Sequence, residues 1–225
     1  MRLLRLQKDL GRKRRQPGSA APTLSEIFPE PAVDAAAMGY MLARLPRTDA
    51  PVLWVQDRLS RREAGRPYLS GIGASRPIIM VNLSRPADVL WTMEDGLRCR
   101  ALAAVIGEVW GDPPALNFTA TKRLVLRSEL AGVPCWLIRR AATPNLSAAR
   151  DRWRIGALPS ATNPYDARAP GKPRWALDLF RSRQAKPGKW VAEYDRATDH
   201  LCHTASVRDG TLAEGKGTSK QRATG

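Results

Sequence analysis

Two short apolar runs separated by a helical segment constrain the fold of this chain more than any other feature. The runs cover Ala101–Val109 and Val133–Ile138, and neither has the polar alternation of a half-exposed strand, which indicates strands covered on both faces. A strand, a crossover helix and a second strand predict a parallel sheet and an α/β fold. One face of the intervening helix gathers Phe118, Thr121, Leu124, Val125, Ser128 and Ala131.

Capping residues and composition place the other elements. Asp112 is the expected cap of that helix, Pro113 and Pro114 suit its first turn, and Gly132 suits its end. The helix expected at residues 86–100, just before the first apolar run, has Leu90, Met93 and Leu97 at core spacing. We expect further strands at residues 24–28, 51–56 and 77–82, and further helices at 35–45 and 86–100.

Charge and cysteine content bound the partners and the compartment. The 225 residues include 37 Lys and Arg against 21 Asp and Glu, a net charge of +16 that favours an acidic partner, nucleic acid first. Cys99, Cys135 and Cys202 lack disulfide-framework spacing, so we expect reduced thiols in a cytoplasmic protein, the first two within core segments. No signal-peptide core or membrane-spanning apolar stretch is found, so no membrane association is expected.

Composition divides the chain into four segments. Residues 1–21 form a basic arm, 22–140 the α/β core, 141–203 a segment rich in Arg, Trp and Pro, and 204–225 a tail expected to be disordered. The arm is either a solvated tail or a contact for nucleic acid or a partner. Arg174–Arg181 and Lys189–Asp195, joined by a loop with Pro187 and Gly188, predict a C-terminal β-hairpin.

The loop after the first expected strand is where a nucleotide-dependent α/β protein carries its P-loop. Phosphate binding there needs glycines that expose backbone N–H groups, a lysine, and a Ser or Thr for Mg²⁺. This loop instead has prolines, which lack an N–H, and an aspartate whose charge opposes phosphate at a helix N-terminus. We therefore expect no nucleotide cofactor and no catalysis at its residues, which include Pro29, Glu30, Pro31, Asp34 and Ala35.

Two carboxylates, Asp57 and Glu108, lie near the carboxyl ends of expected strands, where open α/β sheets place their ligand sites. A metal-binding or catalytic role would need the missing phosphate cradle beside them. Helix capping or a solvated position is therefore the favoured interpretation for both.

Two tryptophans lie among basic residues in the C-terminal segment. Trp153, between two arginines, favours base stacking or a partner contact, whereas Trp175 alternates with Leu177 and Leu179 and favours a core anchor. The candidate contact residues for nucleic acid or a partner are Arg150, Arg152, Trp153, Arg154, Lys172, Arg174, Arg181, Arg183 and Lys189.

A short cluster near the end of the chain contains three of the side-chain types that bind zinc. His200, Cys202 and His203 offer three ligands, but a closed zinc site needs a fourth. We therefore expect no metal there and favour an exposed cluster at the end of a strand.

Five sequence blocks together resemble the ImuA family, the RecA-like accessory proteins of bacterial SOS mutagenesis. The blocks are PVLWV at 51–55, MEDGLRCRALAAVIGEV at 93–109, LNFTATKRLVLRSELAGVPCWLIRR at 116–140, SAARDRWRIGALPS at 147–160 and GKPRWALDLFRSRQAKPGKWVAEYD at 171–195. The resemblance implies a RecA-like core, a Walker-A position at Pro29–Ala37 and a Walker-B-like carboxylate at Glu108.

The resemblance also implies a function in the DNA damage response, in error-prone translesion synthesis. The family works beside an ImuB-type, polymerase-like protein without catalytic residues and an error-prone DNA polymerase, and RecA and DNA are further candidate partners. Because the Gly-Lys-Thr/Ser element is absent here, we expect a non-catalytic adaptor. One alternative is a RecA-like ATPase or DNA-binding recombination modulator with a divergent P-loop, in which Asp57 or Glu108 handles Mg²⁺. Another is a DNA-binding protein without a polymerase partner.

Overall fold

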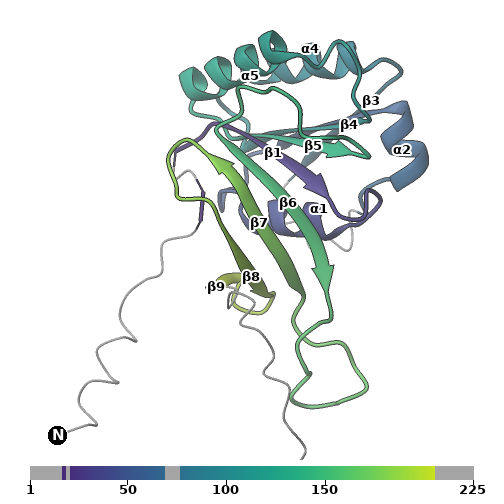
Figure 1. The fold of residues 1–225 in the computed structure, drawn as a ribbon, viewed down its shortest axis with the longest axis vertical. Coiled ribbons are helices and arrows are strands. Elements are labelled where there is room, and N and C mark those ends of the chain that lie inside the picture. Colours follow the sequence, from purple (N-terminus) through teal and green to yellow (C-terminus); the bar gives the residue numbers. More distant parts are fainter. Residues whose placement is uncertain (1–16, 19–20, 69–76, 206–225) are drawn as a thin grey trace, which may run out of the picture.

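One continuous sheet forms the centre of the fold (Figure 1). The computed structural model describes residues 17–18, 21–68 and 77–205, so most of the basic arm and nearly all of the expected C-terminal tail lie outside the described residues. The sheet has nine strands in the order β3-β2-β4-β5-β1-β6-β7-β8-β9. It passes without interruption from the expected α/β core into the C-terminal segment.

Six strands run parallel, which confirms the predicted α/β class. β1 lies between β5 and β6, and Ile27 on β1 is in register with Ile138 and Trp153. We did not predict β6, because Asp151, Arg152 and Arg154 give it a charged composition. The six strands are β1 (Leu24–Pro29), β2 (Val52–Asp57), β3 (Ile78–Leu83), β4 (Ala104–Trp110), β5 (Cys135–Arg140) and β6 (Asp151–Leu158).

The remaining strands run antiparallel and extend the sheet beyond β6. β7 (Arg174–Ser182) and β8 (Gly188–Asp195) form the predicted hairpin. β9 (His200–Ala205) pairs with β8 and was not predicted. Residues 204 and 205 belong to β9, so the structured part of the chain continues past the expected start of the tail.

Helices cover the two faces of the parallel half of the sheet, α1 on one face and α4 and α5 on the other (Figure 1). Tyr40 and Met41 of α1 pack with Trp54 and Trp153, whereas Met93 of α4 packs in the opposite layer. The helices are α1 (Ala36–Ala43), α2 (Arg58–Ala64), α4 (Pro86–Gly96) and α5 (Phe118–Ala131).

The start of α5 differs from the prediction. Its cap is Asn117, whose Oδ1 accepts a hydrogen bond from Ala120 N at 3.0 Å, and Asp112 contacts Arg139 and Thr143 instead. Asp112, Pro113 and Pro114 therefore belong to the preceding loop, and Phe118 is exposed rather than part of the core face. Gly132 ends the helix with φ 72°, as predicted.

The core positions of α4 and of its C-cap residue were predicted correctly, but the position of one cysteine was not. Leu90, Met93 and Leu97 are buried. Cys99 is exposed because α4 ends at Gly96 and the chain turns away from the core before β4. Cys135 is buried, and burial raises the pKa of its thiol, so it is an unreactive core residue.

Candidate functional site

The loop between β1 and α1, the predicted P-loop position, places the carboxylate of Asp34 at the N-terminus of α1. Asp34 Oδ1 accepts a hydrogen bond from Ala36 N, at the start of α1, at 2.8 Å. Its Oδ2 accepts one from Ala157 N on β6, also at 2.8 Å. The N-terminus of α1 therefore has an anionic partner from its own chain, which satisfies a backbone donor that would otherwise face a ligand.

Carbonyl groups of this loop point at a buried cation. Arg140, at the end of β5, donates from Nη1 to Ala32 O at 2.8 Å and to Asp34 O at 3.3 Å. A P-loop presents N–H groups to a phosphate anion. Here the loop presents oxygen atoms to a guanidinium, so the polarity of the contact is reversed.

Glu108 holds Arg140 in place. Its Oε2 lies 2.7 Å from Arg140 Nε, and both side chains are at most 2% exposed. Its Oε1 accepts hydrogen bonds from Trp54 Nε1 at 2.7 Å and Gln56 Nε2 at 3.1 Å. The prediction of a capping or solvated carboxylate was therefore wrong for Glu108, because three donors from β2 and β5 surround it inside the core.

The loop is also pressed against β6. Glu30 N donates to Ile155 O at 2.8 Å, and a Cβ atom added at Gly156 would lie 2.7 Å from Glu30 O. Because that neighbour is a backbone atom, only glycine fits at position 156 without moving the loop. Pro29, expected in the loop, is the last residue of β1.

Asp57 caps a helix and is buried, which agrees with the first of the two predicted alternatives, a cap or a solvated carboxylate. Its Oδ1 accepts a hydrogen bond from Ser60 N at 2.6 Å at the start of α2. Its Oδ2 accepts a hydrogen bond from Trp110 N at 3.1 Å, which ties the ends of β2 and β4 together. Both oxygens have structural donors.

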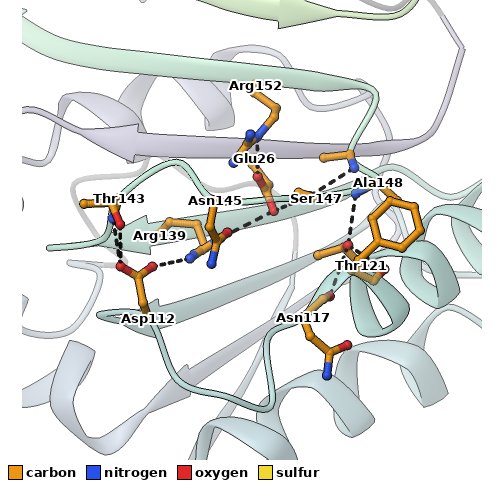
Figure 2. A network of polar contacts seen from close by, with 12 residues as sticks. Glu26, Asp112, Asn117, Thr121, Arg139, Thr143, Asn145, Ser147, Ala148 and Arg152 are labelled. Carbon is orange, nitrogen blue, oxygen red and sulfur yellow. Dashed lines mark hydrogen bonds and ion pairs between the residues drawn. The ribbon is translucent and has the colours of Figure 1, made fainter.

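A second buried glutamate, Glu26, is drawn in Figure 2. Because successive strand residues alternate between faces, Glu26 shares the face of Leu24, whereas Glu108 shares the opposite face with Ile106. Glu26 accepts hydrogen bonds from Ser147 Oγ at 2.7 Å and from Arg152 Nε at 2.7 Å, and Arg139 Nη1 lies 3.7 Å from its Oε1. Arg139 also contacts Asp112 Oδ1 at 2.5 Å. Together these contacts fasten the β5–β6 connection, residues 141–150, across β1.

Electrostatics at the edge of this network favour the charged form of Asp112. Partial burial opposes ionisation, but hydrogen bonds from Thr143 and the nearby Arg139 outweigh it and hold the pKa of Asp112 below its ordinary value. Neither Glu26 nor Arg139 was predicted to be part of a site. Two signals in the sequence pointed to this network: an acid inside the apolar run of β1, and two arginines at the end of β5. A buried charge requires a partner of opposite charge, so these residues could have been expected to pair.

Comparison with known proteins decides the family. Two proteins called Protein ImuA, from the Caulobacter vibrioides strains NA1000 / CB15N and ATCC 19089 / CIP 103742 / CB 15, are each 32% identical to this chain over 163 residues. The chain belongs to the ImuA family. The match covers 67% of this ImuA-family chain and 63% of each relative, so the chain spans less than two thirds of these curated relatives. It matches no family model. In its described residues, no helix has both the length and the apolar character needed to cross a membrane.

The first two residues of the Arg-Trp-Arg sequence of this ImuA-family protein are part of the core, whereas the side chain of Arg154 is partly exposed. Trp153 is fully buried, with its ring centroid 5.8 Å from that of Tyr40 and 6.4 Å from that of Trp190. Successive strand residues point to opposite faces, so the neighbouring Arg152 projects toward Glu26, where it is also buried. The predicted contact with DNA or a partner was therefore wrong for Trp153 and Arg152. Trp175 is buried, as expected of a core anchor.

The other candidate contact residues separate into two groups. Arg150, Arg181 and Arg183 line one surface groove with α5. Arg154 pairs with Asp178 and Glu30, and Lys172 pairs with Asp195. Arg174 and Lys189 lie on β7 and β8, away from that groove.

His203 is buried, not part of an exposed cluster. Its Nε2 lies 3.4 Å from Tyr40 Oη, and its ring packs edge-on against that of Tyr40. Cys202, the preceding residue, is exposed on the other side of β9. The predicted exposed cluster at the strand end was therefore wrong for His203.

Burial of His203 predicts an acid-sensitive fold. Burial, together with the charges of Arg44 and His200, lowers the pKa of His203 from 6.5 to about 4. The unfolded chain therefore binds a proton first as the pH falls, so stability present above about pH 6.5 is lost progressively towards about pH 4. Between pH 7 and pH 4 the free energy of unfolding of the wild-type protein should fall. We expect His203→Gln to make this fall smaller by about 1–3 kcal/mol. Urea unfolding across this range measures the difference, and equal pH dependence in both proteins would contradict the expectation.

Proposed function

We propose that the protein is a non-catalytic, RecA-like accessory protein of SOS-induced, error-prone translesion DNA synthesis. In this proposal it is an adaptor for an ImuB-type, polymerase-like protein and an error-prone DNA polymerase. Membership of the ImuA family supports the pathway. The single observation that supports a non-catalytic role is that Asp34 and Arg140 already make, within the chain, the contacts that a nucleotide would need.

A phosphate group would meet unfavourable electrostatics at this loop. It would have to displace the Asp34 carboxylate from Ala36 N or lie beside it, and two anions within a few ångströms repel each other. Arg140 is the nearby cation, but Glu108 and two loop carbonyls already neutralise and surround it. Nucleotide binding would thus require breaking a buried ion pair.

Glu108 is equally unsuited to hold Mg²⁺ or to activate water. Both of its oxygens accept hydrogen bonds, and the side chain is buried. A metal ion would have to remove the Arg140 guanidinium from a low-dielectric environment, where an unpaired charge is very unfavourable. This supports a structural role for the Walker-B-like position.

The proposal predicts that Mg-ATP does not bind. Isothermal titration should give only the heat of dilution, and millimolar Mg-ATP should leave the melting temperature unchanged, because only a ligand of the folded state raises it. A saturable heat signal, or a rise in melting temperature that depends on ATP concentration, would favour the alternative of an ATPase with a divergent P-loop.

Association with the protein partner is the direct test of the adaptor role. The full chain and the ImuB-type protein of the same genome should form a complex at micromolar concentration in a pull-down with purified components. Absence of a complex at that concentration would count against the proposal.

Direct DNA binding is a second candidate function. The net charge of +16 and the exposed Arg181, Arg183 and Lys189 favour it. Affinity that falls steeply with salt would support it, because phosphate contacts release counterions.

A further inference from the structure

A groove on the surface separates α5 from residues 147–150, which lead into β6, and from the end of β7. Its volume is about 510 Å³, within the size range of ordinary binding pockets. Helix α5 contributes Phe118, Lys122, Val125 and Leu126, and the opposite wall includes Arg150, Arg181 and Arg183. The groove lies at the amino-terminal end of β6, whereas the β1–α1 loop lies at the carboxyl end of β1, so the two sites are separate.

The walls of the groove are fixed by hydrogen bonds. Ala148 N donates to Thr121 Oγ1 at 3.0 Å, which ties one wall to α5 (Figure 2). Arg150 makes two hydrogen bonds with Glu129, at 2.6 and 3.0 Å, and Arg183 N donates to Arg150 O at 2.9 Å. A groove held in this way is formed before a partner arrives, which lowers the entropic cost of binding.

The charge of the groove is one-sided. Lys122, Arg150, Arg181 and Arg183 contribute four cations, and no carboxylate is among its lining residues in the described part of the chain. Glu129 neutralises Arg150, but Lys122, Arg181 and Arg183 are exposed. The groove therefore attracts an anionic partner.

The apolar part of the groove decides which kind of anionic partner fits. Val125 is buried beneath it, while Phe118 is 42% exposed and Leu126 is 53% exposed. Leu130, one turn further along α5, is 71% exposed and extends the apolar strip. Single-stranded nucleic acid binds by stacking its bases on aromatic rings, and Phe118 is the one aromatic residue among the lining residues described. Aliphatic side chains flanked by cations instead suit a peptide that carries both acidic and apolar residues.

The charge of the chain's own terminal segments argues against their filling the groove. Residues 1–16 include seven basic residues and one acid, and residues 206–225 include four basic residues and two acids. Like charges would oppose docking of either segment. We propose that the groove binds an acidic segment with apolar side chains from the protein partner. This inference rests on the adaptor function proposed above.

The test compares the affinity of groove variants for the purified ImuB-type protein of the same genome. The double variant Arg181→Glu/Arg183→Glu and the single variant Leu126→Asp should each weaken binding about tenfold or more, since one reverses the charge and the other places a carboxylate in the apolar strip. The matched control is Arg66→Glu/Arg100→Glu, which reverses two exposed arginines that do not line the groove. The affinity of this variant for the partner should stay within about twofold of the wild-type value. Circular dichroism verifies that all variants fold.

Tiled peptides of the partner identify the segment. The peptides that bind the wild-type chain should be acidic and apolar, and replacing their Asp and Glu by Asn and Gln should abolish binding. Wild-type affinity in both groove variants would overturn the inference and leave the adaptor proposal intact, whereas no binding by the wild-type chain would overturn both. If the arginine double variant instead lost affinity for an oligodeoxythymidine of roughly 20 nucleotides and kept the protein partner, the groove would be a nucleic-acid site and the inference would be wrong.

Discussion

Replacing Glu108 by alanine is expected to lower the free energy of unfolding by about 3–5 kcal/mol, because it leaves the charge of Arg140 buried without a counter-ion. Trp54 Nε1 and Gln56 Nε2 would lose their acceptor in the same substitution. Urea unfolding followed by circular dichroism at neutral pH measures the change. A carboxylate that served catalysis would behave differently, since removing such a group usually leaves the stability unchanged or raises it.

Two further variants show whether the loss comes from the ion pair. Glu63→Ala removes an exposed partner of Arg62 and should leave the unfolding midpoint unchanged within error. The double variant Glu108→Met/Arg140→Met should recover much of the lost stability, because no charge remains buried. If Glu108→Ala cost less than about 1 kcal/mol, Arg140 would have to be accessible to water, and the explanation for the closed loop would fail.

Replacing Trp153 by alanine is expected to lower the free energy of unfolding by about 3–5 kcal/mol, because it removes a large side chain that is completely buried between α1 and the sheet. Trp153→Phe should lose less, since it keeps an aromatic ring beside Tyr40 and sacrifices no hydrogen bond of Nε1, which has no partner among the described residues. Urea unfolding of the wild-type protein, Trp153→Phe and Trp153→Ala measures their order of stability, which should fall in that sequence.

An exposed aromatic residue supplies the control for this series. Tyr165 is 96% exposed, so Tyr165→Ala should unfold at the same urea concentration as the wild-type protein. Trp153→Phe should also bind single-stranded DNA as the wild-type protein does. A stable Trp153→Ala protein that had lost about 1–3 kcal/mol of DNA-binding energy would contradict the core assignment, because that loss is typical of a base-stacking residue.

Local patterns in the sequence determined much of the α/β half of the fold. The strands near 52–57 and 78–83, the helix beginning at Pro86 and the β7–β8 hairpin were all predicted, because apolar periodicity and turn residues act over a few neighbouring positions. The same kind of reasoning predicts that the β1–α1 loop is a P-loop position without phosphate-binding residues. Helix capping was one of the two interpretations favoured for Asp57, and its partner Ser60 lies three residues away.

The tertiary structure alone decided where the buried charges and Trp153 lie. Glu108 and Arg140 are 32 residues apart in the sequence, and Glu26 and Arg152 are 126 residues apart. The first pair meets because β4 lies beside β5, and the second meets because β6 lies beside β1. A contact with DNA or a partner was likewise favoured for Trp153 because its neighbours in the sequence are charged, yet its neighbours in space come from α1 and β8. Periodicity reports which face of an element is apolar, but the partner of a buried charge depends on strand order, and strand order depends on contacts between distant segments.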